Sequence, residues 1–171
     1  MQGNPEGKTR DVITKEDLIY ITGFLDGDGC IMVQLVHHKD YRLVYEIRPS
    51  IVFYQKTINK DFLFWLKSKL EIGYIRDRND GMSEYTIVGV KNAIRILNQF
   101  LPFLRLKKKQ AKLALFVLKR MPESGRQMTA KLLYRLSKEV DKFASLNYSK
   151  KRTNTSVQVK KALLEKNLLI P

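Results

Sequence analysis

The sequence predicts an α+β fold in which a four-stranded antiparallel sheet packs against helices. Two observations support this prediction. A capped apolar helix precedes two runs of alternating apolar and polar residues, and a second, shorter helix precedes two more such runs. The predicted core order is therefore αββαββα, and the helical periodicity that follows it adds helices towards the C-terminus.

The first helix is expected to run from Lys15 to Gly27. Thr14 and Asp17 form a capping box, in which a hydroxyl residue precedes an acid by three positions and both side chains satisfy backbone N–H groups. Residues 1–13, ahead of the helix, contain no apolar run, so we expect a flexible leader there and not a signal peptide.

The four strands are expected over residues 30–36, 41–54, 74–78 and 84–90. Alternation gives the first hairpin one apolar and one polar side. Pro49 lies within the second strand. Because proline cannot donate to a ladder, it predicts an edge position or a bulge there.

Further helices are expected over residues 61–70, 91–100, 106–121, 128–145 and 156–168. In the third of these, Leu113, Phe116 and Val117 are expected to face the core. Residues 14–171 are predicted to form a single domain that ends in a basic loop and a helix over residues 146–171. No apolar run of 18 residues is present, so no membrane span is expected.

The segment from Ile21 to Gly29, with the sequence ITGFLDGDG, is the most informative part of the chain. Gly23 and Gly27 share one face of an apolar helix, although each glycine costs a helix about 1 kcal/mol relative to alanine. Positions without side chains at this spacing allow a second helix to approach closely. If that is the same helix of another copy, two Asp28 carboxylates meet at the negative ends of two helix dipoles and require a divalent cation.

The acidic end of this segment has two other interpretations. Asp and Gly are common at a helix C-terminus and in the following turn, so residues 26–29 alone are a weak signal. A calcium-binding loop is excluded, because it would need Asp or Asn in place of Cys30 and Glu in place of His37. Cys30 is also the single cysteine, which excludes an internal disulfide and favours a reducing, intracellular compartment.

The chain has a formal net charge of +15, and the excess is uneven. Residues 104–152 contain 15 basic and three acidic residues. Such a stretch favours a polyanionic partner, and we predict nucleic acid because the basic residues are spread over several elements. A basic solvated surface, a membrane-surface helix or a ribosome-associated protein would account for the charge alone, but not for the paired glycines and acids.

Together with the predicted hairpins, residues 21–29 resemble the motif of LAGLIDADG homing endonucleases of the single-motif, homodimeric type. The resemblance extends from about Asp17 to the C-terminal region and implies the curved sheet of that family. Four further segments carry it: FYQKT at 53–57, GYIRDR at 73–78, PFLRLKKKQA at 102–111 and SLNYSK at 145–150.

The resemblance implies roles for individual residues. Asp28 matches the catalytic, metal-binding acid, and Gly27 matches the neighbour whose backbone carbonyl also contacts metal. Gln55 matches a catalytic polar residue that orients water, and Lys107 a catalytic basic residue that stabilises charge near the scissile phosphate. Asp26, the first acid, is expected to be structural.

One position departs from the family. Where relatives carry an arginine four residues after the glutamine, this chain has Asn59 followed by Lys60, so either Lys60 supplies the charge or the role is missing.

The contacts between subunits are expected at Tyr20, Gly23, Phe24 and Gly27.

The polar side of the sheet is expected to contact DNA, since Arg suits guanine, Gln suits adenine and Glu suits the cytosine amino group. The alternative is an ordinary solvated sheet face. The C-terminal loop resembles a segment that contacts phosphates in this family. The predicted DNA contacts are Met32, Gln34, His38, Tyr41, Glu46, Arg48, Ser50, Tyr54, Tyr74, Arg76, Arg78, Glu84, Thr86, Asn147, Ser149, Lys150 and Arg152.

These expectations describe a homodimeric enzyme that cleaves both strands of a long pseudo-palindromic DNA site, leaves 3′ overhangs and promotes mobility of its host intron. Mg²⁺ is the expected cofactor, and the resemblance implies that Mn²⁺ substitutes for it and that Ca²⁺ binds without cleavage. The alternatives are an intron maturase, which would bind host intron RNA, and a non-cleaving DNA-binding regulator. The expected compartment is a chloroplast, a mitochondrion or the prokaryotic cytoplasm.

Overall fold

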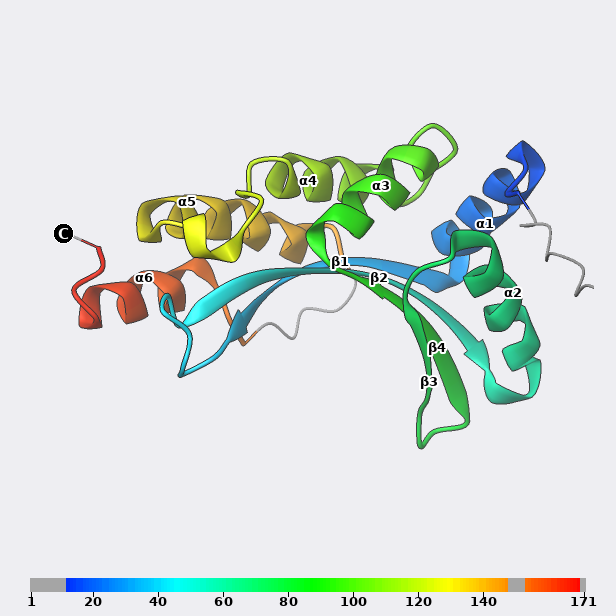
Figure 1. Cartoon of the computed structure of the whole chain (residues 1–171), viewed down its shortest axis with the longest axis horizontal. Coiled ribbons are helices and arrows are strands. Elements are labelled where there is room, and N and C mark those ends of the chain that lie inside the picture. The colour runs from blue at the N-terminus through cyan, green and yellow to red at the C-terminus, as the bar shows by residue number, and fades with distance from the viewer. Residues whose placement is uncertain (1–11, 148–152, 170–171) are drawn as a thin grey trace, which may run out of the picture.

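The computed structural model describes residues 12–147 and 153–169, and its elements follow the predicted order (Figure 1). The helices are α1 (Lys15–Asp28), α2 (Lys60–Leu70), α3 (Val90–Phe100), α4 (Lys108–Leu118), α5 (Ala130–Asp141) and α6 (Ser156–Glu165). The strands are β1 (Gly29–His37), β2 (Tyr45–Lys56), β3 (Tyr74–Asp77) and β4 (Met82–Val88). The 3₁₀ turns are η1 (Thr57–Asn59), η2 (Gly125–Gln127) and η3 (Lys142–Ser145).

The strands form one antiparallel sheet in the order β1-β2-β4-β3. In the β1–β2 ladder, Gln34 lies opposite Arg48, and Ile31 lies opposite Ile51. Because side chains alternate between the two faces of a strand, this register separates a polar face from an apolar face. The two-sided hairpin that the sequence predicts is therefore confirmed.

Helices α3, α4 and α5 cover the apolar face of the sheet, and the opposite face forms an open, concave surface (Figure 1). The core includes the fully buried side chains of Phe53, Tyr85 and Phe100. The Tyr85 hydroxyl donates a hydrogen bond to the Ile72 carbonyl, so this buried polar group is satisfied. In the part of the chain that the structure describes, no helix combines the length and the apolar character that crossing a membrane requires.

Pro49 lies at a local edge of the sheet, which agrees with the prediction, whereas residues 41–44 differ from it. Strand β2 is an inner strand, but its ladder with β4 begins at Ser50, so Pro49 has a strand neighbour only in β1. Proline is tolerated at this local edge because no ladder bond is lost on the open side. Residues 41–44 are predicted as strand but form a turn, in which Val44 has a φ of 63°.

The expectation that Phe116 faces the core is wrong, because its side chain is 41% exposed. Leu113 is partly buried and Val117 is fully buried, as expected. Small residues bring α4 close to the sheet and leave the bulky phenylalanine outside. The buried residues of α4 are Ala111, Ala114, Leu115, Val117 and Leu118.

Candidate active site and nucleic-acid interface

Asp26 connects the end of α1 to the start of α4. Its Oδ2 atom accepts hydrogen bonds from the backbone N–H groups of Arg105 at 2.6 Å and Leu106 at 3.1 Å, and its Oδ1 atom accepts one from Lys107 at 2.9 Å. Arg105 and Leu106 lie in the bend that leads into α4, and Lys107 is the N-cap residue of α4, so the carboxylate satisfies three backbone N–H groups beside the partially positive end of this helix. Asp26 is therefore structural, as the resemblance implies.

This cap places the Lys107 side chain over the last turn of α1. Its Nζ atom donates to the carbonyl of Asp26 and lies 3.4 Å from the carbonyl oxygen of Gly27. Because a helix C-terminus is partially negative, an ammonium group is favoured there. Asp28 is the exposed last residue of the same helix, so the structure brings together three of the predicted site residues.

Gln55 lies at the same end of the sheet. Helix α1 leads directly into β1, and Gly29 of β1 pairs with Phe53, two residues before Gln55. The Gln55 Oε1 atom accepts hydrogen bonds from the Lys56 backbone at 2.9 Å and from the Asn59 side-chain amide at 3.5 Å. These contacts hold its carbonyl oxygen against η1.

Asn59 and Lys60, the two residues at the position where the resemblance implies an arginine, have different partners. Asn59 contacts Gln55, whereas Lys60 forms an ion pair with Asp77 at 2.8 Å between Nζ and Oδ2. Hydrogen bonds from Lys60 and Ser83 hold the pKa of Asp77 below its ordinary value. Lys60 therefore neutralises an acid of β3, and which of the two residues takes the role of the arginine stays a prediction.

The β1–β2 end of the concave face carries four connected residues, all of them predicted DNA contacts. Arg48 Nε donates to Glu46 at 2.8 Å, and Arg48 Nη2 lies 3.0 Å from His38 Nε2. The His38 ring stacks on Tyr41 with 4.3 Å between ring centroids. The contact with Glu46 orients an exposed guanidinium group on this face.

The β3–β4 hairpin supplies the other end of the concave face. Arg76 pairs with Glu84 at 2.7 Å, and Arg78 pairs with Asp80 at 2.8 Å. The Arg76 side chain is 65% exposed, whereas that of Glu84 is 12% exposed, so the arginine is the group presented to solvent. Tyr74, at the start of β3, is also exposed.

The strand alternation places the other predicted contacts of the sheet on the same face, but not all of them are accessible. Gln34 is exposed, and Met32 and Tyr54 are half-buried. Ser50 and Thr86 are only 8% and 5% exposed. Both residues are therefore little exposed in the free chain, and their role as direct contacts stays a prediction.

A groove connects the end of α1 with the C-terminal segment, and Cys30, Lys107 and Asn147 line it. Asn154, on its far side, donates to the Leu35 carbonyl at 2.9 Å and so fixes this segment on the outer edge of β1. Asn147 thus lines the same groove as Lys107, one of the predicted catalytic residues. The predicted contacts Ser149, Lys150 and Arg152 lie outside the described residues.

Neither Cys30 nor Asn154 is among the site residues that the sequence predicts. Strand alternation places Cys30 on the face of Met32 and Gln34, a signal that could have identified it. Burial raises the pKa of the Cys30 thiol, and the Lys107 charge partly opposes this shift. Asn154 contacts a residue 119 positions away, for which no local pattern exists.

The outer face of α1 is exposed although it is largely apolar. Tyr20 is 59% exposed and Ile19 is 48% exposed, and Gly23 and Gly27 are exposed as well. A Cβ atom added at either glycine would meet no atom of the chain within 4 Å. Nothing within the described chain therefore requires these two glycines.

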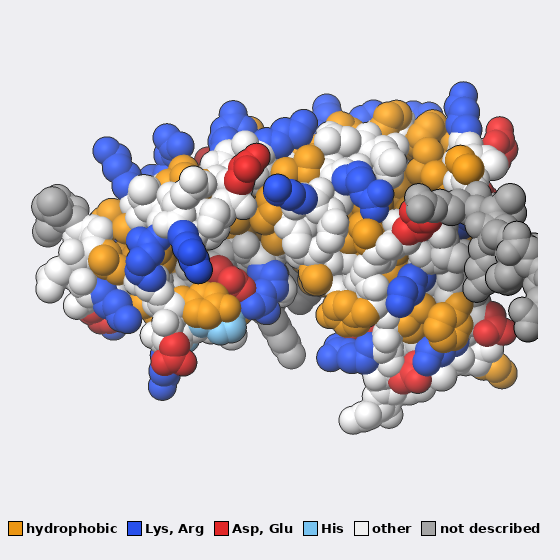
Figure 2. Space-filling model, viewed as in Figure 1, with side chains coloured by type: hydrophobic (Ala, Val, Ile, Leu, Met, Phe, Trp, Pro, Cys, Tyr) orange, Lys and Arg blue, Asp and Glu red, His pale blue; other side chains and the backbone are white. Residues whose placement is uncertain are grey.

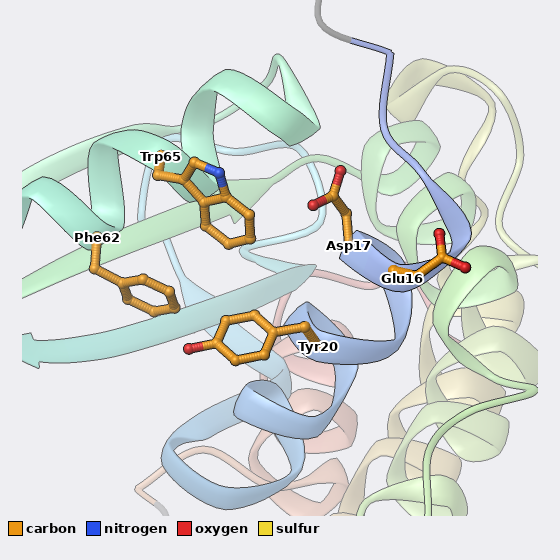
Figure 3. Close-up of a pocket in the computed structure, with 5 residues that line it drawn as sticks. All are labelled: Glu16, Asp17, Tyr20, Phe62 and Trp65. Carbon is orange, nitrogen blue, oxygen red and sulfur yellow. The ribbon is translucent and has the colours of Figure 1, made fainter.

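Phe24, also predicted at the subunit contact, is half-buried. Its ring packs against Phe62 with 4.7 Å between centroids and against Phe53 with 6.3 Å, so part of it contacts the core of its own chain. Its contact with a second subunit stays a prediction. An open aromatic groove follows the flank of α1 (Figure 3), lined by Glu16, Asp17, Tyr20, Phe62 and Trp65.

Comparison with known proteins identifies the class. Residues 21–119 match the family model described as LAGLIDADG endonuclease, and the chain belongs to this family. It is 37% identical over 144 residues to the DNA endonuclease I-CvuI of Chlorella vulgaris, and the aligned region covers 84% of this chain and 88% of that protein. It is also 37% identical over 149 residues to the DNA endonuclease I-CreI of Chlamydomonas reinhardtii, which covers 87% and 90%.

Solved structures share the fold. The crystal structure of I-CvuI in complex with its target, in the presence of Ca, matches with a TM-score of 0.85 and 34% identity over 91% of this chain and 97% of that chain. The archaeal homing endonuclease I-Vdi141I, complexed with DNA, has a TM-score of 0.78 at 21% identity over 90% and 98%, which shows the fold alone. The predicted fold class is confirmed.

Replacement of Asp26 tests the cap. Asp26→Ala removes the acceptor of three backbone N–H groups at a position that is 8% exposed, so we expect the free energy of unfolding to fall by about 3 kcal/mol. Denaturant unfolding followed by circular dichroism measures this. The matched control, Asp28→Ala, should change stability little, because that carboxylate is exposed at the negative end of α1. Equal losses in both variants would contradict the cap.

Proposed function

We propose that this chain is a metal-dependent, site-specific endonuclease that cleaves double-stranded DNA as a homodimer. One observation carries the proposal. Asp28, Lys107 and Gln55 lie at one end of a sheet that has an open polar face, in a chain that belongs to the LAGLIDADG endonuclease family. The named relatives, I-CvuI and I-CreI, are DNA endonucleases.

A divalent cation fits the end of α1. The exposed Asp28 carboxylate and the Gly27 carbonyl are oxygen donors, which Mg²⁺ prefers. The Lys107 ammonium group lies 3.4 Å from the Gly27 carbonyl, so this helix end already attracts positive charge. Structures of I-CvuI with DNA were obtained in the presence of Ca and of Mg. When bound, Mg²⁺ would lower the pKa of the attacking water and stabilise charge on the leaving oxygen.

The side chains of the protein have separate tasks in this proposal. Gln55, whose carbonyl oxygen is held by Lys56 and Asn59, orients water beside the scissile phosphate. Lys107 stabilises the negative charge that develops on the phosphate during in-line attack. Because position 59 carries no charge, Lys107 performs this task without the arginine of its relatives.

A second copy would supply the further metal ligands that the described part of one chain does not provide. Within the described ranges, no group of three or more His, Cys, Asp or Glu side chains could hold a metal ion. Two α1 helices packed through Gly23 and Gly27 would bring both Asp28 carboxylates to the two-fold axis, with DNA phosphates as further ligands. Each subunit then cleaves one strand, and the symmetry of the dimer requires a pseudo-palindromic target. Cleavage across the minor groove would leave 3′ overhangs.

The concave face would follow the major groove of one half-site. Arg48 and Arg76, at its two ends, are exposed and held by acidic partners, and guanidinium groups suit guanine edges. Gln34, which lies opposite Arg48 on the edge strand β1, suits adenine. The groove beside β1 would hold the sugar–phosphate backbone of the DNA, from Lys107 towards Asn147.

Cleavage of a randomised palindromic DNA library in Mg²⁺ tests the activity. We expect the native chain to yield one family of cut sites, and Asp28→Asn to bind the same DNA with similar affinity without cutting it, since only the metal ligand is lost. EDTA should abolish cutting by the native chain. If neither protein cuts but both bind nucleic acid as dimers, a maturase or a DNA-binding regulator replaces the proposal.

Gly23→Leu tests the dimer. The new side chain has room in the monomer, where an added Cβ atom meets nothing within 4 Å, but it would separate two closely packed α1 helices. We expect light scattering to show monomers and cleavage to be lost. Gly125→Leu is the matched control, because Gly125 is equally unobstructed but lies in η2. A Gly23→Leu variant that remains dimeric rules out this packing.

The salt dependence of DNA binding tests the phosphate contacts. Each neutralised phosphate releases a counterion, so affinity for duplex DNA should fall by about a thousandfold or more between 50 and 200 mM salt. Fluorescence anisotropy of Asp28→Asn with a labelled duplex measures this without cleavage. A nearly constant affinity over this range would contradict extensive backbone contact.

A further inference from the structure

The turn between β1 and β2 has a backbone that needs support from other parts of the chain. Val44 has a φ of 63°, a conformation that is unfavourable for a β-branched residue. Two backbone hydrogen bonds close the turn, from the His38 N–H group to the Val44 carbonyl at 2.7 Å and from the Val44 N–H group to the Tyr41 carbonyl at 2.9 Å. Such a conformation persists only where the surrounding structure holds it.

Arg42 connects this turn to the helical layer. Its Nη2 atom donates to the Met128 carbonyl and, at 3.3 Å, to the Arg126 carbonyl. Both acceptors belong to the segment that leads into α5, and they lie 86 and 84 positions from Arg42 in the chain. The turn is therefore fixed to a distant element as well as by its own hydrogen bonds.

The N-terminal cap of α5 makes the Met128 carbonyl available for this contact. In an α-helix, a carbonyl accepts from the N–H group four residues later, which here belongs to Leu132. That N–H group donates instead to the Thr129 hydroxyl at 3.1 Å. The Arg42 guanidinium group can thus take the Met128 carbonyl as acceptor, and the charge of the donor strengthens the hydrogen bond.

The same turn carries the side chains that hold Arg48. The His38 ring stacks on the Tyr41 ring, and His38 Nε2 lies 3.0 Å from Arg48 Nη2. A guanidinium group can only donate, so His38 Nε2 is the acceptor of this hydrogen bond. His38 therefore holds the Arg48 guanidinium group from the turn, and Glu46 holds it from β2.

Arg48 lies far from the candidate cleavage site. It is paired with Gln34, which follows Asp28 by six residues along β1. A strand rises about 3.3 Å per residue, so the separation is about 20 Å, or about six base pairs of duplex DNA. The turn lies further out, at the end of the sheet opposite α1 (Figure 1).

We propose that Arg42 is a positioning residue for target recognition. Through the turn and His38, it holds Arg48 in place to contact a guanine about six base pairs from the cleavage position. This inference rests on the proposed function. It assigns Arg42 no contact with DNA, because its guanidinium group donates to two carbonyls of its own chain.

Binding selection from a randomised palindromic DNA library tests the proposal. All proteins carry Asp28→Asn so that no DNA is cut, and sequencing of the bound duplexes gives the base preference at each position. Arg42→Met keeps the apolar stem but removes the donors, and should lower the guanine preference at one outer base pair about tenfold. Arg48→Met should affect the same base pair. Because both changes act through one guanidinium group, the double variant should lose no more than Arg48→Met alone.

Arg95→Met is the matched control. Arg95 is also exposed and donates to a distant backbone carbonyl, that of Leu70 at 3.2 Å, but it lies on α3. Its replacement should leave every base preference unchanged. Arg42→Lys retains a charged donor and should restore most of the guanine preference.

Four outcomes separate this proposal from its alternatives. Unfolding of Arg42→Met, or an equal loss of preference at all positions, would make Arg42 a general stabilising residue and overturn the proposal. A decrease of about 1 in the slope of log affinity against log salt would make Arg42 a phosphate contact instead. Additive losses in the double variant would show that Arg42 acts independently of Arg48. If the protein with native Arg42 prefers no base at any position, the proposed function itself fails, and this inference fails with it.

Discussion

The three hydrogen bonds of Asp26 are the interaction on which the candidate site depends. They join the last turn of α1 to the start of α4 and thereby place Lys107 over the carbonyl groups beside Asp28. One acid of the motif thus builds the site and the other acid is left exposed. The places of Asp26 and Lys107 follow from the partial charges of helix ends. A carboxylate is stabilised near the N-terminus of a helix, and an ammonium group is stabilised near the carbonyl groups of a helix C-terminus.

The sheet divides the molecule into two sides with different tasks. One face is covered by the helical layer (Figure 1), and strand alternation places most of the exposed polar side chains of the sheet, among them Gln34, Arg48 and Arg76, on the other face. There, Arg48 pairs with Glu46 and Arg76 pairs with Glu84, and these acids hold the guanidinium groups in place before any partner binds. The helical layer carries further exposed Lys and Arg side chains on its outer side (Figure 2), so positive charge lies on both sides of the sheet.

The exposed face of α1 carries two glycines whose cost in helix stability is not explained by any contact within the described chain. Two glycines weaken a helix whose own chain makes no contact with them, and apolar side chains surround them in solvent. A close helix contact with a second copy accounts for both features at once. The same contact would supply the second carboxylate, so that assembly and catalysis have one structural origin in this proposal.

The sequence by itself determined the order of the elements, the capping box of α1 and the two-sided hairpins, because these depend on local periodicity and neighbouring side chains. Only the tertiary structure decided that Asp26 binds backbone 79 to 81 residues away, that Lys60 pairs with Asp77, and that Asn59 lies beside Gln55. It also turned Phe24 inward and Phe116 outward and enclosed Thr86. These outcomes depend on how distant elements pack, which no local pattern records.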